Sequence, residues 1–129
     1  MTIHKAKLGE RFENEAGWIQ NLAEFPVGGV SIIESVAGSR RSDHHHLQDG
    51  HWLYVFKGRM EYFERPVGST EKPECATIEQ GEMVWTGPGV EHATLFPVDT
   101  VLISMSLRPR DHASHESDVV RLASPLPTE

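Results

Sequence analysis

Histidine is the residue type in this sequence whose spacing is best suited to chemistry. Five of the eight histidines gather in two places: His44, His45, His46 and His51 lie together, and His92 lies further along the chain. Residues two apart on a β-strand project from the same face, so we expect His44 and His46 to point together and His45 to point away. Imidazole is a ligand for Zn, Cu, Fe and Ni, and this clustering therefore predicts a metal site without choosing the metal.

Glycines and a proline frame these histidines at defined distances. The pattern G-x5-H-x-H-x4-H-x6-G begins at Gly38, and the pattern G-x5-G-P-G-x2-H begins at Gly81. Together they resemble the two signature motifs of the cupin superfamily, and the resemblance covers residues 30–107. It implies that the metal ligands are His44, His46, His51 and His92. The sequence departs from the family pattern in two ways: His51 replaces a glutamate ligand, and Phe96 stands where an asparagine often lies.

A site of four imidazoles has a distinct electrostatic character. Because the ligands are neutral, a bound divalent ion keeps its full charge, and it should attract anionic, oxygen-donating compounds such as carboxylates, enolates or oxo-acids. The resemblance implies one divalent transition metal as cofactor, with Fe, Mn, Zn, Ni and Cu all open. The alternative interpretation is that these histidines are solvated turn residues whose spacing arose by chance.

The elements that must position the histidines are short β-like runs separated by Gly and Pro. These runs cover residues 30–36, 51–56, 60–64, 75–78, 82–86, 92–96, 100–107 and 118–122. Runs of this length with turn residues between them predict an all-β antiparallel sandwich or barrel. The resemblance makes this a cupin (jelly-roll-like double-stranded β-helix) barrel. We expect one cupin domain over residues 1–129, with a barrel core at 30–107 and extensions at 1–29 and 108–129.

Composition limits the classes of function. The chain carries a formal net charge of −7, which argues against general binding to nucleic acid because phosphates would be repelled. No apolar stretch approaches the roughly 18–20 residues of a spanning helix, so we expect no membrane partner. The single cysteine, Cys75, excludes an internal disulfide, and no signal peptide is evident. These features favour the cytoplasm, with Cys75 as a buried thiol.

Several residues are candidates for a substrate pocket. Barrel-facing positions of the runs predict a mostly apolar pocket, with core packing as the alternative for each residue. Arg40 could hold an anionic substrate with its neighbour Arg41, or the two could be a solubilising pair. Tyr62 is the candidate acid or base, although its ordinary pKa near 10 would have to be lowered. The pocket candidates are Arg40, Tyr62, Met83, Trp85, Thr94 and Phe96.

Two further stretches bear on partners and on additional sites. Trp52, Tyr54 and Phe56 alternate along one run and should share the face opposite to His51. A row of three exposed aromatics is unfavourable, so we expect a homodimer through this face, with packing inside the chain as the alternative. The histidines of the segment 112–115 have the spacing of a helical metal site, but we expect them on a surface loop.

Two classes of function follow. The first is a metal-dependent enzyme on a small oxygen-rich metabolite (an oxo-acid, a diketone or a sugar-related compound), acting as a dioxygenase or as an isomerase or epimerase. The second is a non-catalytic module that binds a small molecule or a metal. The sequence shows no helix-turn-helix pattern, which argues against a transcription regulator.

Overall fold

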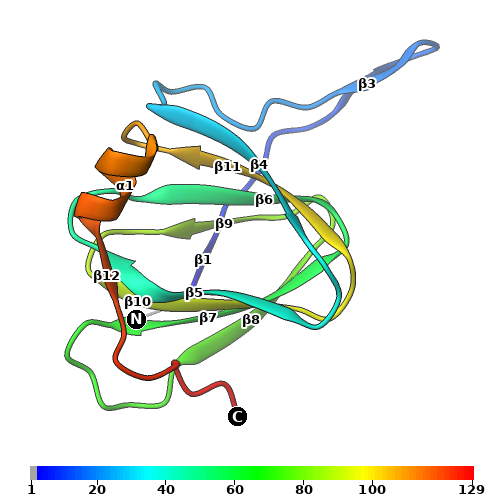
Figure 1. Ribbon diagram of the computed structural model, residues 1–129. Helices are drawn as coiled ribbons and strands as arrows, with labels where there is room; N and C mark the ends of the chain where they lie inside the picture. The colour runs from blue at the N-terminus through cyan, green and yellow to red at the C-terminus, as the bar shows by residue number, and fades with distance from the viewer. Residues whose placement is uncertain (1–2) are drawn as a thin grey trace.

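The computed structural model describes residues 3–129 as two five-stranded antiparallel sheets that face each other (Figure 1). The first sheet has the order β1-β9-β6-β11-β4 and the second has the order β12-β5-β10-β7-β8. The predicted all-β antiparallel architecture is confirmed. The elements are β1 (His4–Lys5), β2 (Phe12–Asn14), β3 (Gly17–Ile19), β4 (Gly29–Ser35), β5 (Ser39–His46), β6 (His51–Lys57), β7 (Arg59–Pro66), β8 (Glu74–Glu79), β9 (Met83–Thr86), β10 (Val90–Phe96), β11 (Thr100–Ser106), α1 (His112–Asp118) and β12 (Val119–Arg121).

The core lies between the two sheets and comes from the alternation of side chains along each strand. On β6, for example, Leu53 and Val55 point into the barrel and are almost fully buried. Apolar side chains fill one end of the barrel, whereas the histidines occupy the other. The buried apolar cluster consists of Leu53, Val55, Met60, Tyr62, Ile78, Val84, Phe96 and Leu102.

The chain itself covers most of the aromatic face of β6. Tyr54 is buried beneath the N-terminal segment, and Trp52 packs 5.0 Å from Trp85 and 6.4 Å from Phe25 between ring centroids. Only Phe56 remains largely exposed. Packing inside the chain, the alternative for this face, therefore covers Trp52 and Tyr54, because the first extension folds back over them. The homodimer itself stays a prediction.

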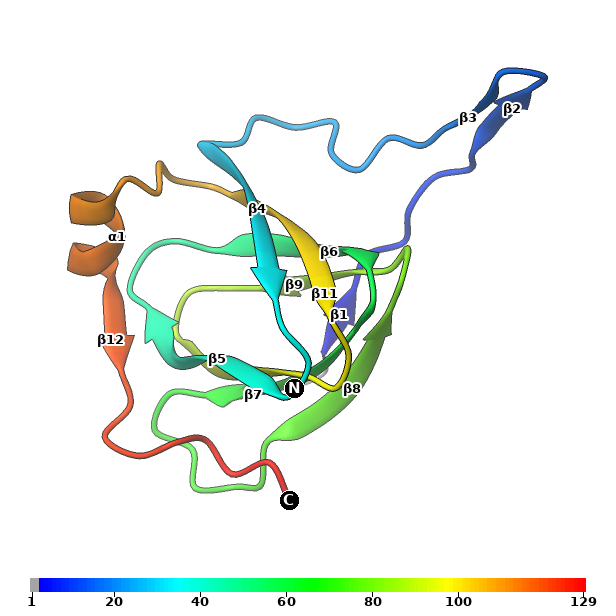
Figure 2. The same cartoon turned by 45° about the vertical axis from the view of Figure 1, so that its right-hand side comes forward.

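Two elements extend beyond the barrel. The β2–β3 hairpin projects well away from both sheets (Figure 2). Helix α1 lies across one end of the barrel and leads directly into β12, which pairs with β5 (Figure 1). The Asp111 side chain caps the helix by accepting a hydrogen bond from the Ser114 backbone N–H. The prediction of a surface loop at 112–115 is therefore wrong.

Two other expectations concern the thiol and the membrane. Cys75 is exposed on β8, so its prediction as a buried thiol is wrong. Over residues 3–129, the structure contains no helix that is long and apolar enough to cross a membrane.

Candidate metal centre

The four histidines come from three strands and meet inside the barrel. His44 and His46 lie on β5, His51 begins β6, and His92 lies on β10 directly opposite His44. One ring nitrogen from each of His44, His46 and His92 lies within 4.8 Å of the other two. The His51 ring centroid lies 5.3 Å from that of His46 and 5.5 Å from that of His92. The structure thus groups the nitrogens of three of the predicted residues, with the His51 ring beside them.

A β-bulge in β5 aims His44 into the barrel. Opposite β10, the pairing of β5 skips Asp43, and both Ser42 and Asp43 have positive φ values, 77° and 58°. Such values are uncommon for residues other than glycine, and bulges of this kind re-aim side chains next to functional sites. The extra residue reverses the alternation of the strand. Consequently Arg41, not Arg40, shares the inner face with His44.

Arg40 lies outside the barrel, in contrast to the prediction that it lines the pocket. It pairs with Leu95 of β10 in the register and donates two hydrogen bonds to the Asp43 carboxylate, at 2.6 and 2.7 Å. It also donates to the backbone oxygen of Leu126, which ties the C-terminal segment to β5. The Arg40 side chain therefore stabilises the fold and does not face the cavity.

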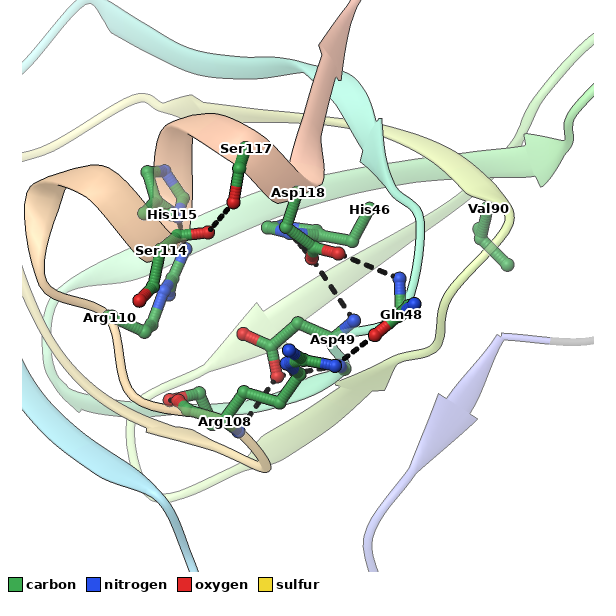
Figure 3. A network of polar contacts seen from close by, with 12 residues as sticks. His46, Gln48, Asp49, Val90, Arg108, Arg110, Ser114, His115, Ser117 and Asp118 are labelled. Carbon is green, nitrogen blue, oxygen red and sulfur yellow. Dashed lines mark hydrogen bonds and ion pairs between the residues drawn. The ribbon is translucent and has the colours of Figure 1, made fainter.

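Hydrogen bonds on the outer ring nitrogens orient two of the histidines. His46 Nδ1 lies 3.3 Å from Asp118 Oδ2, and His92 Nδ1 lies 3.1 Å from the backbone oxygen of Val90. Both partners are acceptors, so each Nδ1 carries the proton and each Nε2 presents a lone pair. Asp118 is itself fixed, since it accepts from the backbone N–H groups of Gln48 and Asp49 (Figure 3). A carboxylate or carbonyl behind the imidazole is the usual support of a metal-binding histidine.

The inner nitrogens have no hydrogen-bond partner. His46 Nε2, His92 Nε2 and both nitrogens of His51 are buried without a partner among the described residues. A buried polar atom left unsatisfied costs about 1–3 kcal/mol, so a cluster of such atoms needs an explanation.

Burial also keeps these imidazoles neutral. Desolvation, aided by neighbouring imidazoles, lowers the pKa of His44 to about 2, and it lowers the pKa of His92 to about 3. The pKa of His51 is well below its ordinary value, mainly because the ring is buried, and that of His46 is lowered for the same reason. Neutral imidazoles with free lone pairs are suited to hold a metal ion.

A cavity of about 270 Å³ adjoins the cluster. Its apolar wall includes Phe96 and Leu102, and its polar wall includes Arg110 and His115, which follow β11. Of the predicted pocket residues, Thr94 and Phe96 lie in this wall. The lining residues are Ile33, Arg41, Ser42, His44, His51, Leu53, Thr94, Phe96, Leu102, Arg110 and His115.

The other predicted pocket residues lie elsewhere. Met83 packs beneath the N-terminal segment and Trp85 against Trp52, because Val84 and Thr86 are the inward positions of β9. Tyr62 is inside the barrel but fully buried in the core, where its hydroxyl contacts Glu64 and Thr86. Burial and the Glu64 carboxylate raise the pKa of Tyr62, which is opposite to what an acid–base role requires.

Three residues beside the histidines were not predicted to be part of the site: Asp118, Arg110, and His115, which was expected on a surface loop. All belong to the C-terminal extension, which lies outside the resemblance to cupins. The available signals were the spacing of His112 and His115 and the capping residue Asp111, but a helix of seven residues is too short to show a hydrophobic period.

Comparison with family models and with curated proteins gives no match. Solved structures do match: QdtA, a sugar 3,4-ketoisomerase from Thermoanaerobacterium thermosaccharolyticum in complex with TDP, has a TM-score of 0.75 at 16% identity, over 94% of this chain and 88% of that chain. WlaRA, a TDP-fucose-3,4-ketoisomerase from Campylobacter jejuni, has a TM-score of 0.75 at 12% identity, over 93% and 89%. ChmJ, a 3'-monoepimerase from Streptomyces bikiniensis in complex with dTDP-quinovose, has a TM-score of 0.71 at 15% identity, over 86% and 66%.

This chain has the cupin fold. The likeness spans nearly the whole chain, so the expected barrel architecture is confirmed. At these identities, what is shared is the fold, and the chemistry of this chain must be argued from its own residues.

Proposed function

We propose that this chain is a single-domain, metal-dependent cupin enzyme that acts as an isomerase or epimerase on a small, oxygen-rich, sugar-related metabolite. The observation that carries the proposal is the set of unpartnered, neutral imidazole nitrogens that converge inside the barrel. The proposed ligands are His44, His46, His51 and His92, and the proposed cofactor is one divalent transition metal (Fe, Mn, Zn, Ni or Cu).

The residues present fit such an ion. His46 and His92 each have one nitrogen fixed by an acceptor and the other free, which is the arrangement that a ligand requires. His44 contributes to the same group of nitrogens, and His51 is buried with both nitrogens unpaired. A metal ion would accept the lone pairs of all the inner nitrogens at once. A hydrogen bond between the Nε2 atoms of His46 and His92 would need a proton on one of them, but both rings carry their proton on Nδ1.

When bound, a divalent metal would supply Lewis-acid polarisation of a substrate oxygen, or a site for O2. The chain's own residues perform the remaining tasks. Asp118 and the Val90 carbonyl hold the imidazoles in one orientation, while Phe96 and Leu102 keep water from one side of the cavity. Arg110 and His115 present polar groups to a substrate beside the histidines.

The solved structures support isomerisation or epimerisation over oxygenation. QdtA and WlaRA are named sugar ketoisomerases and ChmJ is named an epimerase. Each of these reactions moves a proton at a carbon next to a carbonyl, which a Lewis acid promotes by stabilising the enolate.

The test begins with metal content, measured by plasma mass spectrometry on protein purified without a His-affinity step. We expect about one equivalent in the wild type, loss in His46→Ala and His92→Ala, and retention in the control His112→Ala, whose side chain is exposed on α1. The loaded enzyme is then incubated with keto-sugars in deuterated water, and exchange at the carbon next to the carbonyl is followed by NMR. Metal content that remains negligible after adding each candidate ion would overturn the metal site. Full metal content without exchange on any substrate would favour the non-catalytic binding module.

A further inference from the structure

Arg110 is a cation placed in the cavity without a carboxylate partner. Its guanidinium donates to Ser104 Oγ at 3.3 Å and lies 3.2 Å, through Nη2, from His115 Nδ1. Among residues 3–129, no carboxylate oxygen lies within the 4.0 Å of an ion pair with it. Asp49 and Asp118 lie near enough to raise its pKa, but burial lowers that pKa by more. An unpaired arginine in a cavity wall is unfavourable unless a ligand brings the negative charge.

The contact with Arg110 also fixes the protonation of His115. A guanidinium has only donors, so His115 Nδ1 must accept the hydrogen bond and Nε2 must carry the proton. The His115 ring centroid lies 5.7 Å from that of His46, and His115 lines the cavity. This N–H donor therefore lies beside the histidine cluster. Figure 3 shows Arg110 and His115 side by side, with Asp118 and His46 beyond them.

The remaining walls limit what can enter. Besides Arg110 and His115, the cavity has apolar walls that include Ile33, Phe96 and Leu102. Its other polar lining residues outside the histidine cluster are Arg41, Ser42 and Thr94, and Arg41 is already held by Ser35 Oγ and the Glu34 backbone oxygen. Its volume of about 270 Å³ is at the lower end of the size of ligand pockets, which are about 300–1,000 Å³. A compound of a few carbons with one anionic group fits it.

We propose that Arg110 and His115 form a carboxylate-binding subsite, and that the substrate is a small monoanion such as an oxo-acid or a sugar-derived acid. The guanidinium binds the carboxylate in the planar, bidentate manner that arginine favours, and the remainder of the molecule lies between the histidines and the apolar wall. This inference refines the proposed function by naming its substrate class. The carboxylate site itself is built without any metal ligand.

The test measures binding by calorimetry with pyruvate as the probe, and with methyl pyruvate as the neutral analogue of nearly the same shape. Metal-free and metal-loaded protein are titrated in parallel, so that the carboxylate subsite is judged separately from the metal site. We expect the metal-free protein to bind pyruvate, and to bind the ester much more weakly. Arg110→Gln should weaken pyruvate binding by about 10- to 100-fold, the usual effect of losing hydrogen bonds to a charged group.

Two variants separate binding from folding. Arg108→Gln removes a neighbouring arginine that contacts Gln48 outside this cavity, and it should bind pyruvate like the wild type. His115→Ala keeps the guanidinium and should give an intermediate loss. Metal content equal to that of the wild type in Arg110→Gln shows that the metal site is intact. The proposal is overturned if Arg110→Gln binds pyruvate normally, if acid and ester bind equally, or if TDP binds and pyruvate does not.

Discussion

The carboxylate of Asp118 provides the sharpest test of how the histidine cluster is supported. It accepts three hydrogen bonds, at 2.8 Å from the Gln48 N–H, at 3.1 Å from the Asp49 N–H and at 3.3 Å from His46 Nδ1. These bonds lower the pKa of Asp118, against the opposing effect of burial, so the group is ionised at neutral pH. One side chain at the end of α1 therefore fixes both the turn after β5 and the protonated nitrogen of a proposed ligand.

Two substitutions of Asp118 distinguish its role in stabilising the turn after β5 from its role in supporting His46. Asp118→Ala removes all three hydrogen bonds and should destabilise the metal-free protein by about 3 kcal/mol, at about 1 kcal/mol for each bond. Asp118→Asn keeps one acceptor oxygen and loses one backbone hydrogen bond in either orientation, so it should cost about 2 kcal/mol. With the oxygen in the place of Oδ1, it accepts from the Gln48 N–H, and the NH2 group faces the Asp49 N–H and His46 Nδ1. With the oxygen in the place of Oδ2, it accepts from Asp49 and His46 as a neutral amide. In both orientations His46 loses the ionised acceptor that supports it as a ligand.

We therefore expect Asp118→Asn to weaken metal binding by about 10- to 100-fold, although it is the more stable of the two variants. Stability is measured by urea unfolding of metal-free protein, and affinity by competition for Zn²⁺ with a fluorescent chelator. Glu116→Gln is the matched control, because Glu116 lies on the same helix and pairs with the exposed Arg121. Wild-type Zn²⁺ affinity in a folded Asp118→Asn protein would refute the reasoning.

Two further predictions concern stability. Gly58 has a φ of +97°, and a Cβ there would lie 2.5 Å from the Asp99 backbone oxygen, so Gly58→Ala should cost at least about 2 kcal/mol in urea unfolding. Gly38 has a similar φ of +84° but open space around it, so Gly38→Ala should cost less, and equal losses would contradict the steric argument. The Glu79 N–H and Lys5 hold the pKa of Glu82 below its usual value. Stability from Glu82 is thus present above the ordinary carboxyl pKa and lost as pH falls through the lowered one. Because Glu82 is 39% exposed, Glu82→Gln should cost at most about 1 kcal/mol at pH 7. The difference from wild type should shrink in unfolding curves as pH falls below the ordinary carboxyl pKa, and a constant difference would exclude the charge as its cause.

Local patterns predicted the strands well, because alternation and turn residues act over a few positions. The runs predicted at 30–36, 51–56 and 92–96 correspond to β4, β6 and β10 with ends shifted by at most two residues. The inward and outward residues of β9 were assigned less well. Four residues do not reveal which face is buried, and pairing with β6 places Thr86 beside His51 on the inner face.

Long-range contacts caused the other differences. Arg41 lines the cavity and Arg40 lies outside the barrel because the β5 bulge at Ser42 and Asp43 reverses the alternation before His44. Trp52 and Tyr54 are covered by the N-terminal segment, whose contacting residues lie at least 25 positions earlier in the sequence. Neither effect has a signature within the strand concerned.

The sequence by itself determined the all-β class and that His44 and His46 face the inside of the barrel together, because a spacing of two residues places both on one face of a strand. The set of four histidine ligands stays a prediction. Only the tertiary structure decided what surrounds these histidines. Helix α1 brings His115 and Asp118 back across the barrel end, more than 60 residues after His46, and Arg110 enters the cavity just before it. A local pattern records which residues share a strand face, whereas the return of a distant segment depends on the packing of the whole barrel.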